Sequence, residues 1–142
     1  MITDADIALR LLVAAALGGL LGLERELRDQ PAGLRTHLLV AVGSCLFTLV
    51  SAFGFDAFTT ASAEQAVRAD VTRIASQIVV GIGFIGGGAI LRQSGAIRGL
   101  TTAASLWVTA AVGMAVAAGF EMGAVVTTAI AAVTLAAGKP LE

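Results

Sequence analysis

The part of the chain best equipped for chemistry is a short charged segment between two long apolar runs. It spans residues 22–37, GLERELRDQPAGLRTH, and includes Glu24, Arg25, Asp29 and Arg35. Mixed signs over so few residues predict internal ion pairing rather than a purely basic patch for anionic lipid. Glu24 lies nearest the preceding apolar run, where an unpaired charge is costly. We therefore expect Glu24 to pair with an arginine, either Arg35 or Arg98.

The same carboxylates raise the alternative of a metal site. Mg²⁺ usually keeps several waters and binds through one or two carboxylates, so Glu24 with Glu26 or Asp29 could hold it. The neighbouring arginines oppose a bound cation, which favours a salt-bridge cluster that is structural or binds a partner. Thr36 is predicted to cap the helix that follows. The lone His37 is more typical of an interfacial cap than of a metal ligand.

Enzymatic chemistry has little support in the sequence. There is no His/Cys metal-ligand spacing and no nucleophile with an evident base. Residues 81–86 match the pattern GxGxxG, but the match lies inside an apolar run with no strand before it. We therefore predict a protein that is not an enzyme, needs no cofactor and binds no nucleic acid.

The elements that position these residues are predicted to be membrane-spanning helices. The 142 residues are 57% hydrophobic and 13% charged, with mean hydropathy +0.91, which leaves too little polar surface for a soluble globule. Apolar runs that approach the ~20 residues needed to cross a bilayer are 7–23, 37–55, 71–91, 100–118 and 120–138. The predicted fold is an all-α polytopic membrane protein with five transmembrane helices in one domain, residues 1–138. Residues 139–142 are expected to be a tail, either a truncation point or a tag remnant.

The basic residues predict the topology. Of nine lysines and arginines, six lie after the first span, after the third span or at the C-terminus. The other three are Arg10, Arg68 and Arg73. The positive-inside rule then places the C-terminus in the cytoplasm and the N-terminus outside, with the bilayer as the surroundings of the helices.

Glycine spacing predicts where helices approach one another closely. The first and third spans each carry a pair of glycines four residues apart, and such pairs pack helices within one copy, form a homodimer face or line a pathway. Unwinding of the third span near Gly86 would suit an ion site, and two polar residues share a face of that span one turn apart. The candidates for helix packing or for a pathway are Gly18, Gly22, Arg73, Gln77, Gly83, Gly86 and Gly87.

A shift of 66 positions aligns the two glycine-containing spans and the segments after them. It superimposes Gly22 on Gly88, Gly33 on Gly99, and Thr36 on Thr102. This pattern predicts a parallel repeat of a helical hairpin. Coincidence among residue types that are common in this chain is the alternative.

Five segments carry a resemblance to a known family. They are ERE at 24–26, AGLRTH at 32–37, TRIASQ at 72–77, GIGFIG at 81–86 and RGLTTAASLW at 98–107. In this order they resemble the signatures of the MgtC/SapB family of bacterial membrane proteins. The candidate cluster for partner binding or ion pairing is then Glu24, Arg25, Asp29, Arg35, Thr36, Arg98, Thr101 and Thr102.

The resemblance implies a bacterial inner-membrane protein, followed in some members by a cytoplasmic ACT-like domain. It implies a role in adaptation to low Mg²⁺ and, in pathogens, in virulence through survival inside host cells. It also implies contact with other membrane proteins, such as the membrane sector of F-type ATP synthase, rather than proven Mg²⁺ transport. We therefore expect a regulatory protein that binds a membrane-protein partner or a second copy of itself. The alternative is a small transporter or channel for Mg²⁺ or another cation.

Overall fold

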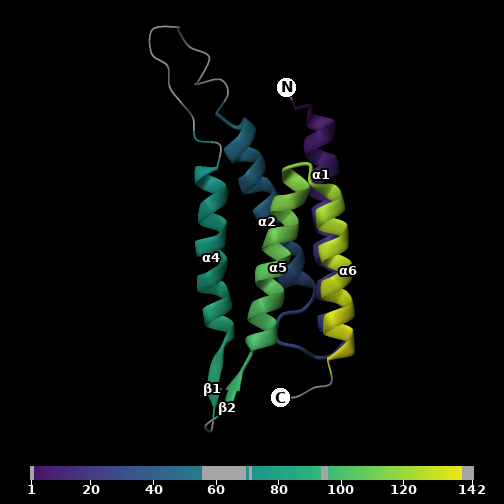
Figure 1. Cartoon of the computed structure of the whole chain (residues 1–142), viewed down its shortest axis with the longest axis vertical. Coiled ribbons are helices and arrows are strands. Elements are labelled where there is room, and N and C mark those ends of the chain that lie inside the picture. The colour runs from purple at the N-terminus through teal and green to yellow at the C-terminus, as the bar shows by residue number, and fades with distance from the viewer. Residues whose placement is uncertain (1, 56–69, 71, 94–95, 139–142) are drawn as a thin grey trace, which may run out of the picture.

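Five helices and one short β-hairpin make up the described part of the chain. The computed structural model describes residues 2–55, 70, 72–93 and 96–138. The elements are α1 (Asp4–Leu27), α2 (Leu34–Phe53), α4 (Arg73–Ala89), β1 (Leu91–Gln93), β2 (Ala96–Arg98), α5 (Leu100–Ala117) and α6 (Glu121–Ala137). The helices alternate in direction, so the start of α1 and the end of α6 lie at opposite ends of the bundle (Figure 1). The predicted helical fold is confirmed, and the predicted tail at 139–142 lies outside the described residues.

Three of the described helices are long and apolar enough to cross a membrane. These are α1, α2 and α5. Helices α4 and α6 have 17 residues each, which corresponds to about 25 Å at 1.5 Å per residue. This length falls short of a hydrocarbon core of ~30 Å. The count of five spans therefore stays a prediction.

Local polar contacts fix where the first two helices begin. The Thr3 side chain accepts a hydrogen bond from the backbone of Asp6, and the Asp6 carboxylate accepts one from the backbone of Thr3, which forms a capping box. Helix α2 begins after Gly33, which has no side chain to cap it. Instead the Leu34 amide donates to the Glu26 carboxylate at 2.8 Å. The prediction that Thr36 caps this helix is therefore wrong, because a carboxylate from the end of α1 already occupies that position.

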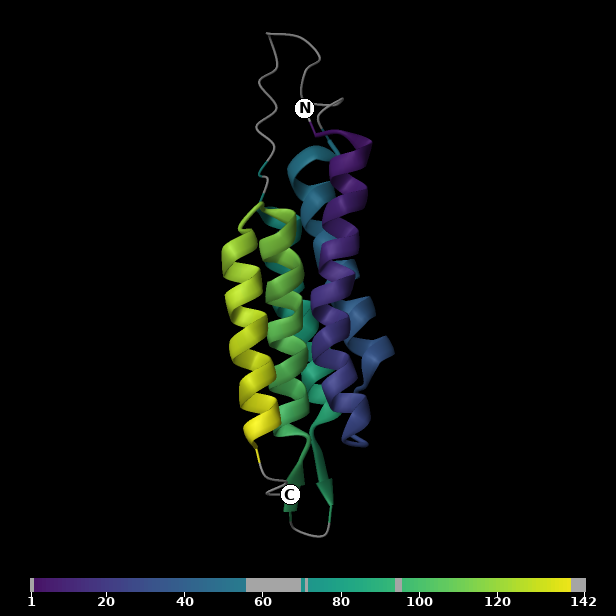
Figure 2. The same ribbon diagram turned by 90° about the vertical axis from the view of Figure 1, so that its right-hand side faces the viewer.

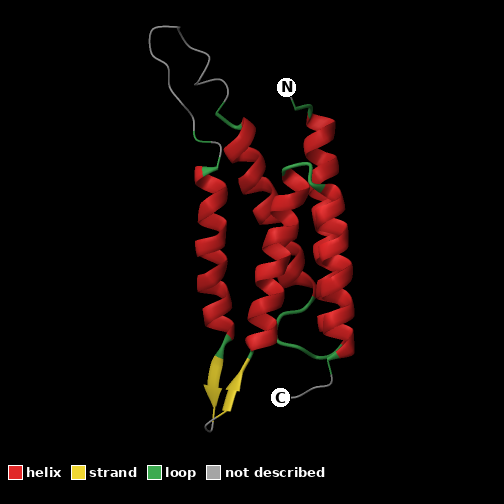
Figure 3. Cartoon of the chain, in the orientation of Figure 1, coloured by secondary structure: helices red, strands yellow, loops and turns green. Residues whose placement is uncertain are grey.

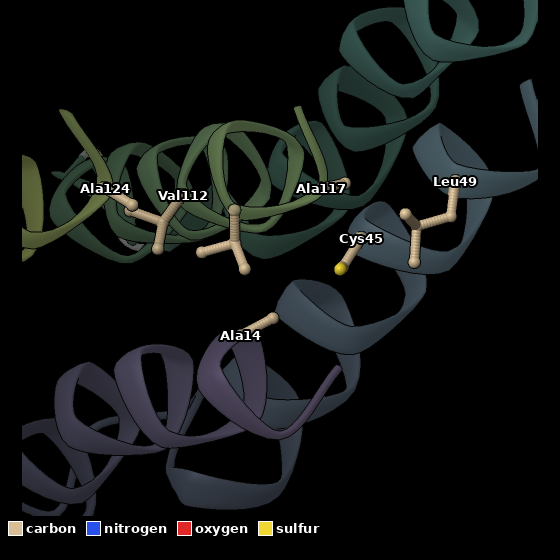
Figure 4. Packing of buried hydrophobic residues seen from close by; sticks show 7 residues of the cluster. Ala14, Cys45, Leu49, Val112, Ala117 and Ala124 are labelled. Carbon is tan, nitrogen blue, oxygen red and sulfur yellow. The ribbon is translucent and has the colours of Figure 1, made fainter. Parts of the chain in front are cut away.

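Helix α2 packs closely against α1 and α5 because glycines on these two neighbours let it approach. A Cβ at Gly18 of α1 would overlap the Ala41 side chain, and one at Gly113 of α5 would overlap the Ala41 carbonyl oxygen. A Cβ at Gly22 would stand 2.7 Å from the Leu34 Cα. The glycine pair of α1 therefore packs helices within one copy. Figure 4 shows the apolar core that this approach creates, where Cys45 of α2 lies among residues of α1, α5 and α6.

The third span and its connector differ from the sequence expectation. Helix α4 stays helical through Gly86 to Ala89, so the unwinding near Gly86 that would suit an ion site does not occur. The connector to α5 is an antiparallel hairpin in which Leu91 faces Arg98, and it projects below the helices (Figure 3). The connector between α1 and α2 contains no strand. The two connectors differ in structure and so do not support the predicted repeat of a helical hairpin. The repeat stays a prediction.

We expect Gly113→Ala to destabilise the bundle, because the new methyl group meets the backbone of α2. Overpacking of this kind costs about 1–3 kcal/mol. Thermal unfolding in detergent, followed by circular dichroism, measures the change. The control is Gly83→Ala, where a Cβ has nothing within 4 Å, and its midpoint is expected to stay at the wild-type value. Equal midpoints for the two variants would contradict this account of the packing.

Candidate functional site

A buried arginine joins α1 to α5 at the end of the bundle that carries the hairpin. Arg25 is 5% exposed and lies in the last turn of α1. Its Nη2 donates to the Gln30 side-chain oxygen at 2.8 Å and to the Thr102 hydroxyl at 3.2 Å. Thr102 is itself buried, in the first turn of α5. A buried guanidinium needs such partners, so these contacts fix α1 against α5.

A second arginine joins the end of α1 to the end of α6. The Arg28 Nε lies 2.6 Å from Glu24 Oε1, one helical turn away. The Arg28 Nη2 also donates to the Ala136 carbonyl oxygen at 2.7 Å. This contact places a positive charge at the C-terminus of α6, where the helix dipole favours a cation. Glu24 thus pairs with Arg28, and the predicted pairing with Arg35 or Arg98 is wrong.

His37 joins α2 to α5 in the interior. It is fully buried at 0% exposed. Its Nδ1 lies 3.0 Å from the Gly33 carbonyl oxygen, and its Nε2 lies 3.0 Å from the Ser105 hydroxyl. The Ser105 hydroxyl in turn donates to the Thr102 carbonyl oxygen at 2.8 Å. His37 is therefore part of the same polar junction as Arg25, rather than the interfacial cap that the sequence predicted.

We use the term polar junction for the residues that make these contacts: Glu24, Arg25, Arg28, Gln30, His37, Thr102 and Ser105. Of the predicted cluster it contains only Glu24, Arg25 and Thr102. The other members are exposed or half-buried and lie outside it: Asp29, Arg35, Thr36, Arg98 and Thr101. Asp29 occupies the connector with φ 55°, which directs the chain away from α1 after the helix ends.

The arrangement of the described side chains does not support a metal site at Glu24 and Asp29. Among them no three His, Cys, Asp or Glu residues lie close enough to hold a metal ion. Glu24 is paired with Arg28, and Asp29 is exposed. Pairing with an arginine suits a structural junction better than a cation site.

Sequence reasoning did not place Arg28, Gln30, His37 or Ser105 in this junction. A signal was present, since Thr102 and Ser105 are three residues apart and share a helix face. His37 likewise shares a face with Ala41, the residue that both neighbouring helices approach. The spacing alone does not reveal that these two faces meet, because that depends on the packing of α2 against α5.

The fold and the junction define a helical membrane protein in which the end of α1 is joined to α5 by the buried Arg25 and to α6 by the exposed Arg28. Residues 11–142 match the model of the MgtC family. The chain belongs to this family, as the sequence resemblance predicted.

Curated relatives support the assignment. The chain is 48% identical to YhiD of Escherichia coli (strain K12) over 120 residues, which are 84% of this chain and 54% of YhiD. It is 44% identical to SapB of Bacillus subtilis (strain 168), over 82% of this chain and 50% of SapB. It is 42% identical to MgtC of Brucella abortus (strain 2308), over 90% of this chain and 49% of that protein. The chain thus spans about half the length of the curated relatives it matches. No solved structure matches it.

We expect Thr102→Val to destabilise the protein, because it removes an acceptor from the buried Arg25 guanidinium. Losing a partner of a buried charged group costs about 1–3 kcal/mol. The control is Thr101→Val at the neighbouring exposed position, where a change within ~0.5 kcal/mol is expected. Reversible unfolding in mixed micelles measures both variants. A stability for Thr102→Val no lower than that of Thr101→Val would refute the role of this contact.

We expect Arg28→Gln to loosen the last turn of α6, because the carbonyl oxygens of Ala136 and Gly138 lose their donor. Hydrogen exchange followed by mass spectrometry should show faster exchange at the end of α6, while α2 stays protected. Arg35→Gln removes an exposed charge outside the junction and should leave exchange unchanged. Faster exchange in both variants would point to a general effect of lost charge.

Proposed function

We propose that this protein supports adaptation to low Mg²⁺ by binding another membrane protein inside the bilayer. The contact surface is the glycine face, defined here as the side of α4 that carries Gly83 and Gly87. The observation behind this proposal is that a Cβ at either glycine would have nothing within 4 Å. In α1, by contrast, both glycines of the pair already meet α2. The pair in α4, which has the same spacing, is therefore available to a helix of another protein or of a second copy.

The packing of α4 supports this use of its outer side. Gly86 faces α5, with its Cβ position 3.5 Å from the Ala103 side chain, and Ile82 is buried against α5. On the other side Val80 is 68% exposed. In lipid, small residues allow the close backbone approach that drives helix association. An edge helix with an open glycine pair is suited to such a contact.

The link to magnesium comes from the family. YhiD carries a name that proposes magnesium transport, and the resemblance noted above implies adaptation to low Mg²⁺ and, in pathogens, virulence. We place the protein in the bacterial inner membrane, with its N-terminus outside and its C-terminus in the cytoplasm. The membrane sector of F-type ATP synthase is the first partner to test, because the same resemblance implies it.

The test is co-purification from native membranes with Gly83→Leu against Gly81→Leu. Both changes add the same side chain to α4, and neither Cβ position has an atom within 4 Å. Only Gly83 lies on the glycine face, so Gly83→Leu should reduce the recovered partner about tenfold, whereas Gly81→Leu should retain it. Growth in low Mg²⁺ should fail with Gly83→Leu alone. Full recovery of the partner by Gly83→Leu would refute the proposed surface.

The glycine face also suits a homodimer when the partner is absent. We expect the purified wild type to have the mass of a dimer in light scattering, after correction for detergent. Gly83→Leu should then give the mass of a monomer. A dimer that survives this change would place the interface between copies elsewhere.

Cation transport is the second candidate, and the observation that favours it is the buried carboxylate of Glu24. Both Glu24 oxygens are shielded from solvent, in a segment where charge is costly. Mg²⁺ flux into vesicles that contain the purified chain decides between the two functions. A gradient-dependent flux that Glu24→Gln abolishes would replace the partner-binding function with transport. We expect none above protein-free vesicles.

A further inference from the structure

We propose that the groove between α2 and α4 binds one membrane phospholipid, with an acyl chain in the groove and a zwitterionic phosphoethanolamine head group at the N-terminal end of α4. This site is distinct from the glycine face and does not depend on the proposed function.

The groove is large and almost wholly apolar. It has a volume of about 570 Å³ between α2 and α4, and its polar lining residues are Ser44 and Gln77. A cavity of about 150 Å³ lined by apolar side chains is enough to hold benzene. The groove therefore has room for a much longer hydrocarbon, and its walls suit an acyl chain rather than water.

Two glycines keep this groove open. Gly43 of α2 and Gly81 of α4 both line it, and a Cβ at either would have nothing within 4 Å. Helix α4 cannot close the space by moving alone, because its Ile82 is buried against Leu106 and Ala110 of α5. The hairpin also ties the end of α4 to the start of α5 (Figures 1 and 2).

Toward the start of α4 the groove contains one polar residue, and the chain just before it carries one charge of each sign. Gln77 lies at the end near the start of α4, and the exposed Arg73 lies one turn before it on the same face. Just ahead, the Asp70 carboxylate accepts hydrogen bonds from the Thr72 hydroxyl at 2.7 Å and the Thr72 amide at 3.0 Å. These bonds, the one from the side chain first, lower the pKa of Asp70 below its ordinary value. At neutral pH Asp70 and Arg73 are therefore oppositely charged.

These groups match the parts of a phosphoethanolamine lipid in order. Arg73 can donate to the phosphate, since arginine forms strong charge-assisted bonds to phosphate oxygens. Asp70 can accept from the ammonium group, and the Gln77 amide can donate to an ester carbonyl oxygen. A helix from a second copy would instead cover Gln77 with apolar surface, which is costly for an unsatisfied amide. The charges at the mouth and the hydrocarbon groove thus favour one amphipathic molecule.

The first test counts lipid bound to the purified protein by native mass spectrometry. After delipidation, addition of dioleoyl phosphatidylethanolamine should give saturable binding of one lipid per chain. Gly81→Leu fills the groove and should weaken binding at least tenfold, and Gly43→Leu from the opposite wall should do the same. Gly83→Leu on the glycine face is the matched control and should bind as the wild type does. Circular dichroism establishes that each variant is folded.

The second test examines the head group. Arg73→Gln should weaken binding of this lipid about tenfold. Arg35→Gln, which changes an exposed arginine in the first turn of α2 outside the groove lining, should not. Dioleoyl phosphatidylglycerol, which lacks the ammonium group, should bind more weakly than the ethanolamine lipid. Tighter binding of phosphatidylglycerol, equal lipid binding by Gly81→Leu and Gly83→Leu, or a dimer that Gly81→Leu converts to monomer would each overturn the proposal.

Discussion

The close approach of three helices around Ala41 is the constraint on which the rest of the structure depends. Gly18 on one side and Gly113 on the other leave no room for a side chain, so α1 and α5 pack directly against the backbone of α2. In lipid this contact cannot come from a hydrophobic driving force between helices, because the tails are as apolar as the side chains. Van der Waals packing at short distance replaces it. The core at Cys45 and the junction at Arg25 both depend on this spacing.

The polar junction forms because this packing brings the ends of the helices together. Hydrogen bonds from a buried charge hold in one register only, so the junction adds a directional constraint to the close packing. Arg25 reaches Thr102 on α5, and His37 reaches Ser105 one turn further along. Arg28 then joins the end of α6 to the same corner. The charged residues at the end of α1 thus hold the ends of α1, α5 and α6 together, and Glu24 is paired with Arg28 rather than open to an ion.

Helix α4 stands apart from this tightly held group. It contacts α5 through Gly86 and Ile82, yet on its remaining sides it presents glycines with open space around them. One of these sides faces the surroundings and the other faces the groove toward α2. Both carry the same residue type, but they suit different ligands, because one is a convex surface for a helix and the other a concave space for a hydrocarbon chain. The least packed helix is therefore the part of the described structure best suited to recognition.

The sequence by itself determined the class of the protein, its helices to within a few residues and its family, because apolar run length and ordered motifs are local properties. It also placed close packing at Gly18 and Gly22, where the spacing of small residues carries the information. Only the tertiary structure decided that Glu24 pairs with Arg28 rather than with Arg35 or Arg98, that Glu26 caps α2, and that His37 is buried. It also distinguished the packed glycine pair of α1 from the open pair of α4, although both have the same spacing. The physical reason is that a helix face acquires its partner from the rotation and separation of its neighbours, which no local pattern encodes.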